Sequence, residues 1–230
     1  MKILITGVAG FIGFHVAKKL IKEGEKVFGI DNLNSYYDQN LKKNLLKELE
    51  KISKNRGNIF KFLFGDISDK EFIRTAFEES KPDIVINLAA QAGVRFSINN
   101  REEYFNSNVK GFFNILEMSK KYKVKHLVYA STSSVYGNST KKPFRENQST
   151  DEPLSFYAAS KKTNEILAYP YSYIHNIKIS GMRFFSVYGP YGRPDMALYK
   201  FVDKMIKGKK IDLYNHGNHL RDFTYIDDVV

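Results

Sequence analysis

The sequence predicts an α/β fold built on a doubly wound parallel sheet with helices on both of its faces. Short, continuously apolar runs alternate with longer segments of helical periodicity along most of the 230 residues. Apolar runs of this kind indicate strands buried on both sides, as in a parallel sheet covered by helices. The first run leads into a glycine-rich turn at residues 7–13, so we expect a fold of the Rossmann type.

Six apolar runs have the length of strands and are separated by segments with helical spacing. The expected strands, in order, are residues 2–6, 26–30, 59–64, 83–88, 126–130 and 178–184. The expected helices between them are residues 11–23, 41–54, 70–79, 101–122 and 155–174. Pro170 falls inside the last helical segment, where its missing N–H predicts a kink or the end of the helix.

The composition is that of an ordinary globular protein with a buried core. Hydrophobic residues make up 43% of the chain, charged residues 27%, and there is no cysteine, so disulfides and thiolate metal sites are excluded. The chain enters its first strand directly, without the pattern of a signal peptide, and no segment reaches the roughly 18 apolar residues of a membrane span. We therefore expect a cytoplasmic protein without a metal centre.

The formal net charge is +11, which raises the question of an anionic partner. The lysines are scattered along helical stretches such as residues 41–54 and form no single basic arm. Neither zinc-finger spacing nor an RNA-binding aromatic signature is present in the sequence. A solvated, lysine-rich surface is the simplest interpretation, and we expect no nucleic-acid partner.

The turn after the first strand has the spacing G-x-x-G-x-x-G, formed by Gly7, Gly10 and Gly13. Glycine lets the backbone turn tightly and approach a pyrophosphate, whose charge the start of the following helix favours. The alternative is a tight strand–helix turn without a ligand. The context of a strand before and a helix after the glycines favours a dinucleotide site.

Two aspartates follow the next expected strands and extend this site. Asp31 ends the second strand, where a carboxylate can accept from both hydroxyls of an adenosine ribose. A 2′-phosphate at that place would meet like charge, so NAD is favoured over NADP. Asp66 follows the third strand and could reach the adenine amine, or it could cap the next helix instead.

Tyr157 and Lys161 are four residues apart in a helical segment and so share a face. A phenol with a pKa near 10 is a poor base at neutral pH, but a nearby ammonium or a positive nicotinamide ring favours its ionised form. The spacing is also common on ordinary amphipathic helices. Following a nucleotide-binding half, it predicts an acid–base pair.

Four hydroxyl-bearing residues, Ser131 to Ser134, follow the strand expected at 126–130 in the stretch STSSVYG. Serine and threonine are common in loops, so a polar loop is one interpretation. The end of a parallel strand is also where such a sheet binds ligands, so a site is the other.

The sequence resembles the extended short-chain dehydrogenase/reductases, and among them the nucleotide-sugar 4-epimerases that act on UDP-glucuronate. The resemblance runs through the stretches GVAGFIGFHVA, GIDNLNSYYD, INLAAQAGVRFS, NSNVKGFFNILE, VKHLVYASTSSVYG, YAASKKTNE, MRFFSVYGPYGRPDMALYKF and RDFTYIDDV. It implies NAD as the cofactor, a UDP-sugar as the substrate, and a role in polysaccharide biosynthesis.

The resemblance also implies the catalytic residues. Thr132 is placed four residues before the tyrosine of the VYG motif and would hold the sugar 4-hydroxyl. Tyr157 would take its proton while NAD takes hydride from C4, and Lys161 would lower the tyrosine pKa and bond the nicotinamide ribose. The 4-keto sugar would then turn and receive the hydride on its other face.

Related reactions make different demands on the residues after Thr132. Dehydratases of the family need an acid pair there, whereas this chain has Ser133 and Ser134. A decarboxylase would let a β-keto acid lose CO2, whereas an epimerase must hold the carboxylate out of line, and we assign that task to Ser133, Ser134, Ser186 and Arg193. Arg193 could instead pair with Asp195 in a turn.

The resemblance adds further contacts. Besides the glycines and the residues named above, the cofactor set comprises Phe11, Ile12, Asn32, Ile67, Leu88, Ala89, Ala90, Asn108 and Phe185, and the substrate set adds Arg95 and Arg221. Asn108 could also be a buried amide that satisfies backbone groups, and Phe185 could be a core residue. The pair Tyr36 and Tyr37 could lie in a plain surface loop.

We expect residues 1–176 to form the NAD-binding domain with the catalytic residues. Residues 177–230 would supply the last core strand and the start of a substrate-binding part that looks truncated, since family members are longer and a helix should begin at 226. Helices 101–122 and 155–174 are candidates for a homodimer interface or for the core. A 4-epimerase of neutral UDP-hexoses, a UDP-glucuronate decarboxylase and a catalytically silent NAD-binding fragment are the alternative functions.

Overall fold

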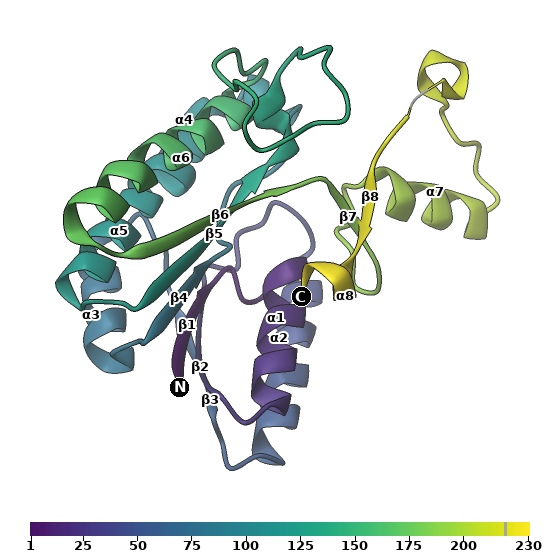
Figure 1. Ribbon diagram of the computed structural model, residues 1–230. Coiled ribbons are helices and arrows are strands. Elements are labelled where there is room, and N and C mark those ends of the chain that lie inside the picture. The colour runs from purple at the N-terminus through teal and green to yellow at the C-terminus, as the bar shows by residue number, and fades with distance from the viewer. Residues whose placement is uncertain (219) are drawn as a thin grey trace.

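The structure, a computed structural model, describes residues 1–218 and 220–230 and contains a six-stranded parallel sheet (Figure 1). The strand order β3-β2-β1-β4-β5-β6 is that of a doubly wound dinucleotide-binding sheet, so the predicted fold class is confirmed. The strands are β1 (Lys2–Thr6), β2 (Lys26–Asp31), β3 (Phe60–Phe64), β4 (Ile84–Asn87), β5 (His126–Thr132) and β6 (Lys178–Phe184).

Helices cover both faces of this sheet (Figure 1). One face carries α1 (Phe11–Lys22) and α2 (Gln39–Lys54), and the other carries α3 (Lys70–Ser80), α5 (Gly111–Lys121) and α6 (Phe156–His175). Because side chains alternate along a strand, Ile3 and Ile5 pack in the cluster of Leu49 on the first face, while Leu4 packs in that of Phe77 on the second. The core is therefore two apolar layers separated by the sheet.

The expected helix at residues 101–122 is interrupted, which corrects the prediction of one continuous helix. It consists of α4 (Arg101–Tyr104), a π-helical segment (Phe105–Lys110) and α5. A tertiary contact accompanies the wider turn: Asn164 Nδ2 donates to the carbonyl oxygen of Asn108 over 2.6 Å. The side chain of Asn108 is also fixed from outside its own helix, by Gln91 and Ser160.

The sequence predicted that Pro170 would either kink or end the helix expected at 155–174, and it does not end that helix. The helix α6 continues through Pro170 to His175. Proline removes the bond to the carbonyl of Ile166, but both residues are exposed, so water can satisfy that group.

Beyond β6 the chain forms a second, smaller unit that the sequence did not predict in full. The short strands β7 (Ser186–Tyr188) and β8 (Phe223–Tyr225) pair in parallel, α7 (Ala197–Ile206) has no buried residue, and the expected final helix is α8 (Ile226–Val229). This unit is attached to α1, because the ring of Tyr191 packs on Phe14 at 5.2 Å and Ile226 is completely buried. Figure 1 shows α8 beside α1 and α7 projecting from the sheet.

Within residues 1–218 and 220–230, no helix combines the length and apolar character needed to cross a bilayer.

We predict that Asn164→Leu in the full-length protein lowers the free energy of unfolding by about 1–3 kcal/mol, because the buried carbonyl of Asn108 loses its donor. Urea denaturation followed by circular dichroism measures this change. The matched control is Thr163→Val on the same helix, whose hydroxyl bonds only the local carbonyl of Ala159. An Asn164→Leu midpoint equal to that of the control would contradict the role assigned to this contact.

Candidate active site

A cavity of about 630 Å³ opens at the carboxyl ends of the parallel strands. This is the edge of a doubly wound sheet where the connections diverge and ligands bind. Its wall takes residues from the segments that follow β1, β2, β3, β4, β5 and β6 and from the unit built on β7 and β8.

The glycine turn after β1 is packed so closely that side chains cannot be added. Gly7 has φ +72°, and a Cβ there would lie 2.7 Å from the amide nitrogen of Ala89. A Cβ on Gly13 would lie 2.1 Å from the carbonyl oxygen of Gly7, so α1 starts directly against the turn. Gly10 directly precedes α1 and provides no side-chain cap, so the N–H groups of the first helical turn can bind an anionic ligand.

Asp31 is held in place before any ligand binds. Its carboxylate accepts from the backbone amides of Leu33 at 2.8 Å and Ala9 at 3.1 Å, and only 8% of the residue is exposed. Burial raises the pKa of this carboxyl, and the two amides and Lys42 oppose that rise. Each carboxylate oxygen has a further lone pair, so the group can still accept from two ribose hydroxyls.

Asp66 lines the same cavity and does not cap the helix after it. Its carboxylate accepts from Asn32 Nδ2 at 2.6 Å and from the amide of Ser68, whereas Asp69 caps α3. The alternative of a cap is therefore wrong. Three features together fit a dinucleotide: the close-packed glycine turn, the uncapped start of α1, and the carboxylates at the end of β2 and after β3. The other residues expected at the cofactor, Phe11, Ile12, Asn32, Ile67, Leu88, Ala89, Ala90 and Phe185, also line the cavity.

The structure brings Thr132 and Tyr157 together at the cavity wall. Thr132 is the last residue of β5, so it lies in the strand and not in the loop after it. Burial raises the pKa of Tyr157 above its usual value, and the nearby Thr132 hydroxyl and the charge of Arg193 oppose that rise without cancelling it. Tyr157 is therefore a neutral phenol at pH 7.

Lys161 lies one helical turn after Tyr157 and is only 2% exposed. Its ammonium donates to the carbonyl oxygen of Ala130 at 2.9 Å, so it is anchored to β5. Burial lowers the pKa of Lys161 to about 8. The predicted pair thus shares one helix face and one cavity, and Lys161 also bonds a carbonyl of β5.

The expected substrate residues Ser133, Ser134, Ser186, Arg193 and Arg221 line the cavity. Arg193 is already paired, since its Nε donates to Asp195 at 2.9 Å and its terminal nitrogen donates to the second carboxylate oxygen. The alternative left open by the sequence, an Arg193–Asp195 pair, is therefore present together with the cavity position.

Two expected residues do not line the cavity. Asn108 is 2% exposed, and its side-chain amide bonds both the N–H and the carbonyl of Gln91. This is the buried amide that the sequence left as an alternative, and its effect on the cavity passes through Gln91, which lines the wall. Arg95 lies just before a 3-10 turn, outside the set of lining residues.

The cavity also contains polar residues that the sequence did not single out as ligands. Lys42 is 5% exposed, donates to the carbonyl and side-chain oxygens of Asn34, and sits over the ring of Tyr37 at 4.7 Å. Tyr36 donates to Asp195 at 3.2 Å. Lys42 could not have been found, because in sequence it is one lysine among many on an amphipathic helix.

Comparison with known proteins relates this chain to one family. The model of the NAD dependent epimerase/dehydratase family matches residues 3–230. The protein named CapI of Staphylococcus aureus is 51% identical over 230 residues, with 100% of this chain and 67% of that protein covered. A probable UDP-glucuronate 4-epimerase of Rhizobium meliloti is 48% identical over 230 residues, with 100% and 66% covered.

Among solved structures, the UDP-glucuronic acid 4-epimerase of Bacillus cereus in complex with UDP-glucuronic acid and NAD is similar, with a TM-score of 0.90 and 35% identity. The match covers 100% of this chain and 70% of that one. The chain thus spans about two thirds of the length of the curated relatives it matches.

The lowered pKa of Lys161 predicts a dependence of stability on pH. Below about pH 8 the folded protein pays for a buried ammonium, and that cost is relieved as pH rises from about 8 toward 10.5, where the unfolded lysine titrates. From pH 7 to pH 10 the difference in unfolding free energy between wild type and Lys161→Met should therefore change in favour of wild type, by on the order of 3 kcal/mol.

Thermal unfolding of both full-length proteins across this pH range measures the difference. Lys162→Met, one residue further along the same helix, controls for the loss of a lysine, since Lys162 is half-buried and bonds Thr150. A constant gap between wild type and Lys161→Met would contradict a buried, weakly basic Lys161.

Proposed function

This chain belongs to the NAD dependent epimerase/dehydratase family, and from that premise we propose that the full-length enzyme interconverts UDP-glucuronate and UDP-galacturonate by inverting C4 of the sugar. The observation that carries the proposal is that Thr132, Tyr157 and Lys161 line the same cavity as the glycine cradle and Asp31. This arrangement supports an acid–base group that acts on a sugar held beside a dinucleotide.

The residues that would hold NAD are those of the cradle and the strand ends. The start of α1 at Gly10 would take the pyrophosphate, Asp31 the adenosine ribose and Asp66 the adenine amine. Bound NAD would accept a hydride from C4 of the sugar and later return it to the same carbon, so no second substrate would be consumed. The raised pKa of Tyr157 fits this scheme, because the phenol needs a nearby positive charge before it can act as a base.

The protein groups then manage the proton. Thr132 would hold the 4-hydroxyl in line, and Tyr157 would take its proton as the C4–H bond breaks. After the 4-keto sugar has turned, Tyr157 would return the proton to the new hydroxyl. Lys161 would act as an anchor, because its ammonium bonds β5 and so keeps the end of this strand against the helix that carries Tyr157.

The residues around Thr132 favour epimerisation over the two neighbouring reactions. Ser133 and Ser134 line the cavity where a dehydratase would need strong acids. Hydroxyls there and on Ser186 can hold a sugar carboxylate, and Arg193 can join them if the carboxylate replaces Asp195 as its partner. This hold would keep the breaking C–C bond out of line with the ketone.

We also retain the division into a cofactor part at residues 1–176 and a substrate part from 177 onward. In support, Ser186, Arg193 and Arg221 all come from the part after residue 176, and all three line the cavity. The cytoplasmic location and the absence of a nucleic-acid partner stay predictions.

Incubation of the full-length protein with UDP-glucuronate, followed by NMR, tests the proposed reaction. UDP-galacturonate is the expected product, whereas a UDP-pentose would indicate decarboxylation, and turnover of UDP-glucose alone would indicate a neutral hexose epimerase. Bound NAD without turnover of any nucleotide sugar would favour a silent domain.

Tyr157→Phe should reduce kcat by about 10²–10⁴-fold, because it removes the proton acceptor. The affinity for NAD, measured by calorimetry, should change little. Tyr169→Phe is the matched control, since Tyr169 lies on the same helix and is 75% exposed. A Tyr157→Phe enzyme that retains its rate would contradict the role of this phenol.

We further propose that the enzyme forms a homodimer through α5 and α6. Five large apolar side chains are exposed on α6: Phe156, Ile166, Tyr169, Tyr173 and Ile174. Light scattering should give the mass of a dimer, and Tyr173→Lys combined with Ile166→Lys should give that of a monomer. A wild-type protein that is monomeric at micromolar concentration would contradict this assignment.

A further inference from the structure

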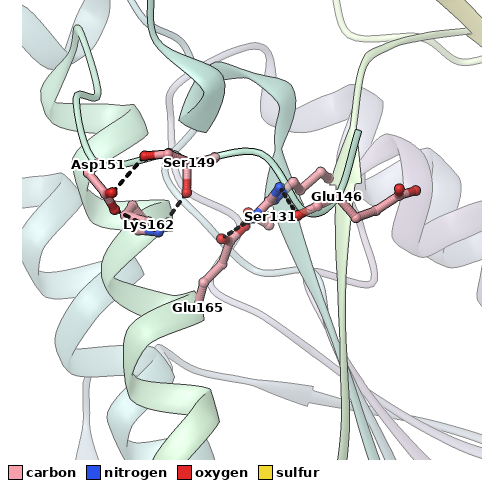
Figure 2. A network of polar contacts seen from close by, with 8 residues as sticks. Ser131, Glu146, Ser149, Asp151, Lys162 and Glu165 are labelled. Carbon is pink, nitrogen blue, oxygen red and sulfur yellow. Dashed lines mark hydrogen bonds and ion pairs between the residues drawn. The ribbon is translucent and has the colours of Figure 1, made fainter. Parts of the chain in front are cut away.

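Ser131 and Glu165 form a buried hydrogen bond that the proposed chemistry does not use (Figure 2). Ser131 Oγ donates to Glu165 Oε1 over 2.6 Å, and Ser131 is only 3% exposed. Figure 2 shows the two side chains meeting between β5 and α6. Ser131 directly precedes Thr132, so a contact that fixes one residue also restricts the other.

Two consecutive residues near the end of β5 are hydrogen-bonded to α6. The carbonyl of Ala130 accepts from Lys161, and Ser131 donates to Glu165. The next residue of the strand, Thr132, lines the cavity together with Tyr157, which lies on the same face of α6 because it is four residues before Lys161. The two hydrogen bonds therefore fix the strand end against the helix that carries Tyr157.

Arg183 extends this contact to the neighbouring strand. It is the register partner of Ser131 in the parallel pair of β5 and β6, and its Nε and a terminal nitrogen both donate to Glu165 at 2.9 Å. Its other terminal nitrogen donates to the carbonyl of Glu146 at 3.1 Å, and the guanidinium lies 5.0 Å from the ring centre of Tyr136. One carboxylate thus joins β5, β6 and, through Arg183, the loop before α6.

Glu165 is suited to this place because it stays charged there. Burial raises the pKa of Glu165, but the bonds from Arg183 and Ser131 outweigh burial and lower the pKa below its usual value. The exposed fractions of the Arg183 and Glu165 side chains are 19% and 15%, so solvent screens the pair only in part. The same loop is also tied to α6 where Lys162 donates to Thr150.

We infer that Glu165 is a positioning residue, which holds the Ser131–Thr132 segment against α6 so that the Thr132 hydroxyl stays aligned with Tyr157. The inference rests on the proposed function, since alignment matters only if Thr132 and Tyr157 act together on the sugar hydroxyl. An epimerase needs this alignment twice in each turnover, once for each face of C4. Neither Ser131 nor Glu165 needs to touch the substrate for this role.

The full-length enzyme carrying Ser131→Ala, Glu165→Gln or both tests this role. Each single change should lower kcat on the order of tenfold with KM altered by less than about twofold, because a displacement of about 1 Å at reacting groups costs rate more than binding. The double variant should resemble Glu165→Gln alone, since both changes remove one contact. Ser131→Thr, which keeps the hydroxyl, should retain most of the rate.

A matched control is Glu117→Gln. Glu117 also accepts a hydroxyl hydrogen bond, from Tyr171 on α6, but this bond joins α6 to α5 and not to β5. Hydrogen exchange of the peptide spanning residues 128–135 gives a readout that needs no turnover. Exchange there should quicken in Ser131→Ala and Glu165→Gln and remain unchanged in Glu117→Gln.

The two proposals fail in different ways. Unchanged exchange at 128–135, an unchanged kcat, or equal losses in Glu117→Gln would overturn the role of Glu165. An inactive wild type whose exchange still responds to Ser131→Ala would overturn the proposed function and leave the contact as a structural anchor only.

Discussion

The parallel pairing of the strands is the constraint on which the site depends. Because all six strands run the same way, their carboxyl ends meet at one edge, and residues far apart in sequence come together there. Gly7, Asp31 and Thr132 follow or end three different strands, yet they line one cavity. An antiparallel neighbour in place of any of these strands would have moved its group to the opposite edge.

The helix α6 adds a second level of order to that edge. It carries Tyr157, Lys161 and Glu165 on one face and so presents a phenol, an ammonium and a carboxylate to consecutive residues of β5. Burial has a different result at each group. It raises the pKa of the phenol, which stays neutral, and lowers the pKa of the ammonium, whereas at the carboxylate the bonds from Arg183 outweigh it. The charge state of the site is thereby set by packing as much as by residue type.

The sequence located most of the sheet and much of the cavity, because both follow from local patterns. Buried strands are continuous apolar runs, and the glycine turn has few conformations open to other residues. The π-helical segment could not be predicted, since it goes with a bond from Asn164, more than fifty residues further along the chain. The same holds for the pairing of β7 with β8, which joins segments that are far apart in the sequence.

The contact between Tyr191 and Phe14 joins the segment after β6 to the helix that starts at the glycine turn. Phe14 belongs to that helix, and Tyr191 lies in sequence between Ser186 and Arg193, which both line the cavity. His15 adds a second attachment through the carbonyl of Pro190 at 2.9 Å. The segment that carries Ser186 and Arg193 is thus anchored at two neighbouring points of α1, and it cannot move away from this helix without breaking both contacts.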